Sequence, residues 1–156
     1  MSKNSNVLAL KYRPLTFNDL IGQEVVAQTI LNSIKSQKIP NAYLFTGIRG
    51  IGKTTIARIV AKSLNCINSI ENKCKDNCSI CDAIANSNHI DVLEMDAASK
   101  TGVDDVRELI EFSRYGPTSA KYKIFIIDEV HMLSKQAFNA LLKTLEEPPE
   151  YLKFIF

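Results

Sequence analysis

One stretch of the chain combines the residue types that bind a nucleotide phosphate. Gly47, Gly52, Lys53 and Thr54 match the pattern G-x-x-x-x-G-K-[ST]. Glycines let the backbone take positive φ and come close to a phosphate, while the loop N–H groups and the following helix attract the anion. Lys53 supplies a positive charge for the outer phosphates, and Thr54 offers a hydroxyl to Mg²⁺. We therefore predict a phosphate loop made by Gly47, Ile48, Arg49, Gly50, Ile51, Gly52, Lys53, Thr54 and Thr55.

The alternative is a glycine-rich turn followed by a chance Lys-Thr pair. The residues before the loop, 42–46, are typical of a buried strand. Those after it carry apolar side chains at helical spacing, at Ile56, Ile59, Val60 and Leu64. A strand before the loop and a helix of about three turns after it are the context that the phosphate-loop interpretation requires.

A second motif ends in two carboxylates. The apolar run from Lys123 to Ile127 predicts a strand buried on both faces, and Asp128 and Glu129 follow it directly. In a protein with a phosphate loop, an acid at this point holds Mg²⁺, and the next acid can deprotonate the attacking water. The alternative is a pair of solvated acids at a strand end, and the presence of the phosphate loop disfavours it. The tetrad Asp-Glu-Val-His, ending at His131, also occurs in helicases, but no other feature of the sequence supports a helicase.

Four cysteines, the whole complement of the chain, form a third motif at Cys66, Cys74, Cys78 and Cys81. The residues between them are rich in Asn, Lys, Asp and Ser, so this segment cannot build a core of its own. Four thiolates around a structural Zn²⁺ would stabilise it, and we predict a zinc module over 66–81. Free buried thiols are the alternative, and a redox C-x-x-C pair would leave two cysteines without a role.

Composition limits the class of protein. The chain has 156 residues, with 46% apolar and 23% charged residues, which suits one globular domain. The net charge of +2 neither requires nor excludes nucleic acid. No apolar segment follows the N-terminus as in a signal peptide, and no apolar run approaches the ~18 residues that span a bilayer. We therefore expect a cytoplasmic protein without a membrane partner.

The elements that must position these motifs alternate along the chain. An extended arm around Pro14 precedes a helix from Gly22 through Gln37. We place His89 at the surface and assign it no role. The other expected elements are strand 42–46, the loop helix, a short helix Asp82–Asn88, strand 89–95, helix Gly102–Ser113, strand 123–127, a helix after Ser134 with buried Phe138, Leu141, Leu142 and Leu145, and a strand from 153. This order predicts an α/β fold with a parallel sheet covered by helices on both faces.

Several runs of residues, in this order, resemble one family. They are Tyr12-Arg13-Pro14, Phe17, Gly22-Gln23, the phosphate loop, residues 128–133 and residues 141–149, with the cysteine insert between loop helix and second strand. Over residues 9–156 the chain is similar to the gamma/tau subunits of bacterial DNA polymerase III, the AAA+ ATPases of the sliding-clamp loader. The cysteine insert argues against another AAA+ machine such as a branch-migration motor, although its spacing is slightly irregular for the family.

The resemblance implies a P-loop NTPase fold with strand order 5-1-4-3-2, and ATP, Mg²⁺ and Zn²⁺ as cofactors. It implies adenine binding near Arg13, Pro14, Val25 and Val26, with Lys53, Asp128 and Glu129 in catalysis. In the loop 97–101, it implies that Lys100 faces DNA. It also implies a hetero-pentamer with other clamp-loader subunits, which acts on the sliding clamp and primed DNA together with the DNA polymerase III core.

The resemblance also implies elements that do not occur before residue 156. These are a γ-phosphate sensor at the end of the strand begun at Phe154, a Ser-Arg-Cys motif that serves a neighbouring subunit, a second sensor, a lid and a collar domain. We therefore expect residues 1–156 to be the N-terminal part of an AAA+ domain with an incomplete sheet, which binds ATP but hydrolyses it very slowly. A nucleotide-binding subunit without turnover is the alternative.

Overall fold

The computed structural model describes residues 12–67 and 78–156. The N-terminal tail and Cys74 therefore lie outside the described residues. The strands are β1 (Ala42–Tyr43), β2 (Val92–Asp96), β3 (Lys123–Asp128) and β4 (Leu152–Ile155). The α-helices are α2 (Glu24–Lys35), α3 (Lys53–Asn65), α4 (Ser79–Ala85), α5 (Val103–Ser113) and α6 (Lys135–Glu146), and the 3₁₀ helices are η1 (Phe17–Asp19) and η2 (Val130–Met132).

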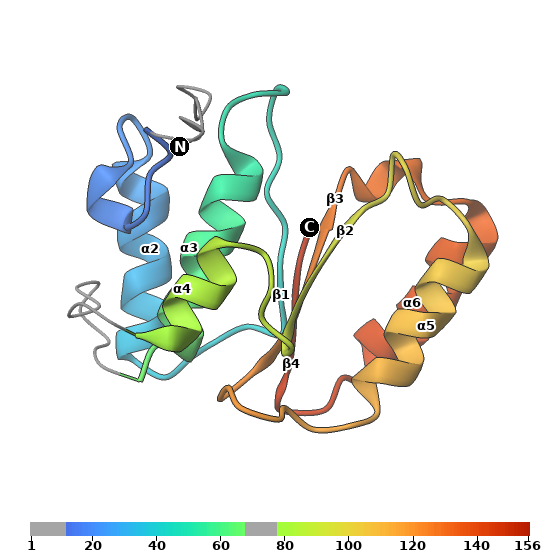
Figure 1. Ribbon diagram of the computed structural model, residues 1–156. Helices are drawn as coiled ribbons and strands as arrows, with labels where there is room; N and C mark the ends of the chain where they lie inside the picture. The colour runs from blue at the N-terminus through green and yellow to red at the C-terminus, as the bar shows by residue number, and fades with distance from the viewer. Residues whose placement is uncertain (1–11, 68–77) are drawn as a thin grey trace, which may run out of the picture.

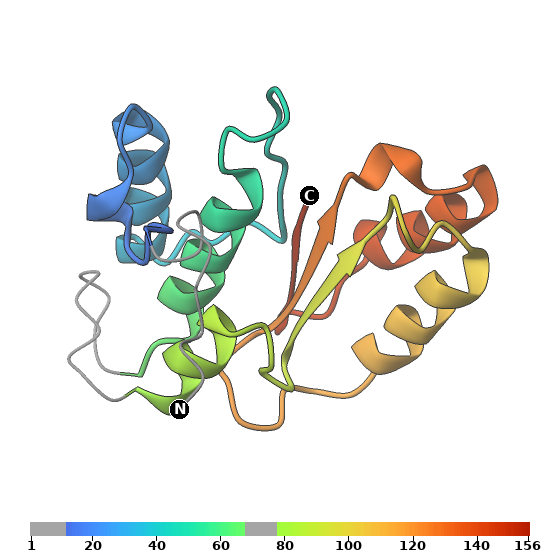
Figure 2. The same cartoon turned by 45° about the horizontal axis from the view of Figure 1, so that its top comes forward.

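The four strands form one parallel sheet in the order β1-β4-β3-β2. Helices α3 and α4 cover one face, with α2 on their outer side, and α5 and α6 cover the other face (Figures 1 and 2). The fold class is therefore the α/β arrangement that the alternation of elements predicted. The order also agrees with the four corresponding strands of the expected sheet.

Strand β3 divides the core because its side chains alternate between the two faces. Ile124 and Ile126 pack with α2, α3 and α4. Phe125 and Ile127 pack with α5 and α6. A strand buried by helices on both sides must be apolar at every interior position, which explains the continuous apolar run in its sequence.

The element boundaries differ from prediction in several places. Strand β2 runs from Val92 to Asp96 rather than over 89–95, and α4 ends at Ala85 rather than Asn88. Strand β1 has only two residues, although backbone pairing continues from Phe45 N–H to the carbonyl of Phe156 at 2.7 Å. Helix α2 ends at Lys35, and Gln37 takes a positive φ of 56° that ends the helical path. Helix α4 begins at Ser79 rather than Asp82, because the carbonyl of Cys78 already accepts from the N–H of Asp82.

Helix α6 begins as predicted at the cap Ser134, whose hydroxyl accepts from the N–H of Ala137 at 3.2 Å. Its buried face is rotated from the predicted one. Ala137 and Leu141 are buried, whereas Phe138 is 40% exposed and Leu142 36% exposed. Ala137 and Leu141 belong to the core cluster that also holds Phe125 and Phe154, whereas the larger side chains one position later lie outside it.

Candidate functional site

The phosphate loop joins the end of β1 to the start of α3. Gly50 and Gly52 take φ of 86° and 99°, a region that a side chain with a Cβ rarely adopts. Gly52 is the N-cap of α3, so the loop N–H groups lie beside the positive end of the helix. The Lys53 ammonium donates to the carbonyls of Gly47 at 2.9 Å and Ile48 at 3.2 Å. This geometry holds the positive charge across the loop, where a phosphate would need it.

Asp128 lies at the carboxyl end of β3 and contacts the first turn of α3. Its Oδ2 accepts a hydrogen bond from the Thr54 hydroxyl, and its Oδ1 accepts from the N–H of Glu129 at 3.0 Å. A hydroxyl and a carboxylate beside a phosphate loop are hard oxygen ligands of the kind that Mg²⁺ takes. These residues therefore fit a magnesium site, with Thr54 and Asp128 as its protein side.

Glu129 has a left-handed backbone with φ of 53° and ψ of 42°. A residue with a Cβ in this conformation carries a cost of about 1 kcal/mol or more, and such residues concentrate at functional sites. The Glu129 carboxylate is partly exposed and lies 3.4 Å from Nε2 of His131. The turn thus separates two neighbouring acids, with Asp128 directed to the helix and Glu129 beside the open cavity.

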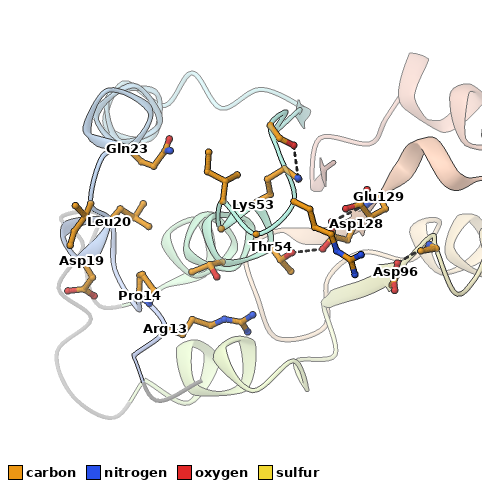
Figure 3. Close-up of a pocket in the computed structure, with 18 of the residues that line it drawn as sticks. Arg13, Pro14, Asp19, Leu20, Gln23, Lys53, Thr54, Asp96, Asp128 and Glu129 are labelled. Carbon is orange, nitrogen blue, oxygen red and sulfur yellow. Dashed lines mark hydrogen bonds between the residues drawn. The ribbon is translucent and has the colours of Figure 1, made fainter. Parts of the chain in front are cut away.

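These groups line one cavity of about 990 Å³. The arm and the start of α2 form one wall, and the ends of β2 and β3 form the other, with the phosphate loop between them (Figure 3). The wall from the arm includes Tyr12, Arg13, Pro14, Asp19, Leu20, Ile21 and Gln23. The cavity therefore has room for a nucleotide, with Arg13, Asp19 and apolar groups on one side and three carboxylates, Asp96, Asp128 and Glu129, on the other.

Most of the site residues expected from sequence are brought together here. Arg13, Pro14 and the loop residues from Gly47 to Thr55 line the cavity, except Ile48, which is exposed. Val25 and Val26 are not among the lining residues. Val25 is 80% exposed, and Val26 packs against the core under α2. The apolar residues that do line the cavity just before α2 are Leu20 and Ile21.

Three of the four cysteines converge at a separate place. The sulfur atoms of Cys66, Cys78 and Cys81 all lie within 4.8 Å of one another. Around a tetrahedral Zn²⁺ with Zn–S bonds of about 2.3 Å, sulfur atoms lie about 3.8 Å apart, so the cluster fits the metal. Cys66 follows α3, Cys78 precedes α4 and Cys81 lies in its first turn. A zinc ion here would join the two helices; Cys74 lies outside the described residues.

Lys100 lies apart from the cavity, on the loop between β2 and α5. Its side chain is exposed, and its N–H donates to the carbonyl of Asp96 at 2.9 Å. The buried Ala97 anchors this loop, because its N–H donates to the carbonyl of Asp128 at 2.9 Å. Lys100 therefore extends from a loop that is hydrogen-bonded to the end of β3.

Sequence reasoning missed Asp96, which lines the cavity at the end of β2. Its Cα pairs with that of Asp128 on the adjacent strand, and its Oδ1 accepts from the N–H of Ala98 at 2.8 Å. The signal was present, because parallel strands end at a common edge and Asp96 closes its strand just as Asp128 closes the next one.

Sequence reasoning was wrong about His89. Its side chain is 8% exposed, and its Nδ1 accepts from the N–H of Asp91 at 3.0 Å. Asp91 is fully buried, and its carboxylate accepts from the N–H groups of Thr118, Ser119 and Ala120 at 2.7 to 2.9 Å. The loop before β3 closes over these two residues, and nothing local to residues 89–91 signals that contact.

Comparison with known proteins gives consistent matches. The family model described as DNA polymerase III, delta subunit, matches residues 22–156. The chain is 50% identical over 149 residues to DNA polymerase III subunit tau of Escherichia coli, covering 96% of this chain and 23% of that protein. It is 54% identical over 153 residues to DNA polymerase III subunit gamma of a Buchnera aphidicola strain, covering 97% of this chain and 41% of that protein. The chain thus spans about two fifths of these relatives or less.

Solved structures with a similar fold come from Thermotoga maritima. A DNA polymerase III gamma subunit-related protein superposes with a TM-score of 0.59 at 24% identity, over 82% of this chain and 37% of that one. A RuvB variant superposes with a TM-score of 0.58 at 18% identity, over 92% of this chain and 40% of that one. At these identities the likeness shows the fold, which this chain shares with both proteins. None of the helices in the described ranges has the length and hydrophobicity needed to traverse a bilayer.

Proposed function

Because the chain belongs to the DNA polymerase III subunit family matched over residues 22–156, and is homologous to gamma/tau subunits, we propose that it binds and hydrolyses ATP in a clamp loader. The observation that carries the proposal is the joining of Lys53, Thr54, Asp128 and Glu129 around one cavity. We propose ATP and Mg²⁺ as ligands of this cavity and Zn²⁺ as the ligand of the cysteine cluster.

Each side chain has a distinct part in the proposed reaction. The loop N–H groups and Lys53 hold the β- and γ-phosphates, and Thr54 and Asp128 hold Mg²⁺. When bound, Mg²⁺ would supply positive charge that offsets the negative charge developing on the phosphates. Glu129 accepts a proton from the water that attacks the γ-phosphorus, so the products are ADP and inorganic phosphate.

The proposed partners follow from the homology. They are other clamp-loader subunits in a hetero-pentamer, the sliding clamp, primed DNA and the DNA polymerase III core, all in the cytoplasm. Residues 1–156 would form the N-terminal part of the AAA+ domain, with 66–81 as its zinc module. Hydrolysis by residues 1–156 alone should be slow, because an arginine supplied in trans is worth roughly 10³–10⁵ in rate in related phosphate-loop enzymes.

Glu129→Gln tests the proposal when ATP binding and turnover are both measured with the partner subunits present. We expect unchanged ATP affinity and a loss of turnover of about 10²–10⁴-fold, the usual contribution of a general base. Glu108→Gln, an exposed position on α5, is the matched control. The competing function is a nucleotide-binding subunit without turnover, which the intact Glu129 disfavours. If the wild-type chain and Glu129→Gln hydrolyse ATP equally slowly in the complex, that competing function is correct.

A further inference from the structure

One ion pair joins α3 to β2 just beyond the phosphate loop. Arg58 donates from Nε to Oε1 of Glu94 and from a terminal nitrogen to Oε2, both at 2.7 Å. Both side chains are 19% exposed. The other ion pairs among the described residues connect positions two or three apart, and each includes at least one largely exposed side chain. Within residues 12–67 and 78–156, this ion pair ties two elements together, and its two parallel hydrogen bonds have the strong, planar geometry of a bidentate arginine–carboxylate pair.

Arg58 lies on the same face of α3 as Thr54, because residues four apart in a helix are neighbours. The two residues contact carboxylates on adjacent strands: Thr54 contacts Asp128 on β3, and Arg58 contacts Glu94 on β2. In the sheet, Asp96 pairs with Asp128, and Glu94 is two residues before Asp96.

The spacings of the two attachments agree. Four residues of helix rise about 6 Å, and two residues of strand rise about 6.6 Å. The helix is thus held to the sheet at two points, one turn apart. One attachment leaves the helix axis free to pivot about that point, whereas two attachments on the same face also fix the direction of the axis over the strands.

We propose that Arg58 and Glu94 are positioning residues, which hold the Thr54 hydroxyl at Asp128 and so act on magnesium-dependent nucleotide binding. The inference rests on the proposed function, since it assumes that the cavity takes ATP with Mg²⁺. Neither residue lines the cavity. Their effect is therefore indirect, and it is specific to the Thr54–Asp128 side of the site. The phosphate contacts of the loop backbone and Lys53 depend on residues before this point in the helix.

The test compares ATP affinity in EDTA with ATP affinity in excess Mg²⁺, by isothermal titration on the whole chain. The ratio of the two affinities is the magnesium enhancement. For Arg58→Gln and Glu94→Gln we expect affinity in EDTA within about threefold of wild type, and a magnesium enhancement reduced about tenfold, as for loss of a charged hydrogen bond. Arg107→Gln, which breaks an exposed pair with Asp104 on α5, is the matched control and should change neither.

Two further variants separate positioning from simple stabilisation. In a chain that already carries Thr54→Val, adding Arg58→Gln should leave the magnesium enhancement unchanged, because the group that Arg58 positions is gone. The double variant with Arg58→Glu and Glu94→Arg reverses the ion pair. It should recover part of the magnesium enhancement that is lost when either of these two substitutions is made alone. If Arg58→Gln unfolds the chain at 25 °C by circular dichroism, Arg58→Lys, which keeps one donor, takes its place in the same measurements.

The outcomes are distinct. Equal losses of affinity in EDTA and in Mg²⁺ would show that the pair only stabilises the fold, and the inference would be wrong. An unchanged magnesium enhancement in both Gln variants would also overturn it. If wild-type protein binds ATP no more tightly with Mg²⁺ than without, the proposed magnesium site itself fails, and the inference fails with it.

Discussion

The Thr54 hydroxyl donates a hydrogen bond to the carboxylate of Asp128, a residue 74 positions later in the chain. This contact joins the first turn of α3 to the carboxyl end of β3. It brings together the two motifs that sequence analysis identified separately, and it defines the side of the cavity where a cation would meet the phosphates. The predictions below test this site, the cysteine cluster, a buried carboxylate and an exposed loop lysine.

Lys53→Ala should weaken ATP binding severely. The Lys53 ammonium lies across the phosphate loop, 2.9 Å from the carbonyl of Gly47, where it can meet the outer phosphates. Loss of a charged hydrogen bond of about 1.5–3 kcal/mol corresponds to an affinity about 10- to 150-fold lower. Isothermal titration with ATP and Mg²⁺ measures it, with Lys35→Ala, at an exposed position of α2, as the control. An unchanged ATP affinity of Lys53→Ala would show that the phosphate-loop assignment is wrong.

The cysteine cluster should hold about one Zn²⁺ per chain, as one tetrahedral site requires. Cys66, Cys78 and Cys81 supply three converging sulfur atoms, and we predict Cys74 as the fourth ligand. Metal analysis of purified protein measures the content, and a chelator should lower the melting temperature because the ion joins α3 to α4. Cys81→Ser should lose most of the zinc. Metal-free protein with all four thiols reactive in the native state would refute the site.

Asp91 should make the fold sensitive to acid. Burial by itself raises the pKa of Asp91, but the backbone N–H groups of Thr118, Ser119 and Ala120 outweigh burial and lower this pKa below its ordinary value of 3.8. Because the pKa is lower in the folded than in the unfolded state, the stabilisation is complete above about pH 4 and is lost as the pH falls toward the folded-state pKa.

Asp91→Asn should therefore lower the free energy of unfolding at pH 7 by about 2 kcal/mol or more, since it puts a neutral amide opposite three donors. The difference in free energy of unfolding between Asp91→Asn and wild type should become smaller as the pH falls from 5 to 3. Urea unfolding across this range measures it, and Asp104→Asn, an exposed position on α5, is the control. A difference that does not depend on pH would show that the charge on Asp91 is not what stabilises the loop.

Lys100→Ala should weaken DNA binding in an assembled complex without any preference among base sequences. Lys100 is exposed on a loop just before α5, and a helix N-terminus attracts phosphate. Removing one phosphate contact should reduce the slope of log affinity against log salt by about 1. Fluorescence anisotropy over a range of salt concentrations measures the slope, and Lys35→Ala is the control. The same slope for wild type and Lys100→Ala would exclude the contact.

The sequence by itself determined the local parts of the site. The glycine positions of the phosphate loop encode the positive φ angles at Gly50 and Gly52, and the apolar run before Asp128 encodes a strand buried on both faces. Both are properties of consecutive residues, because backbone conformation and periodicity depend on near neighbours. The alternation of strands and helices gave the parallel sheet for the same reason.

Only the tertiary structure decided the contacts between distant segments. The burial of His89 and Asp91 depends on a loop almost 30 residues later, which covers them and supplies three N–H donors. The buried face of α6 depends on how the helix packs against the rest of the core, and the apolar spacing alone allowed Phe138 instead. The pairing of Arg58 with Glu94 requires α3 to lie at one rotation over β2. Such contacts are set by packing between elements, which the periodicity of each element leaves open.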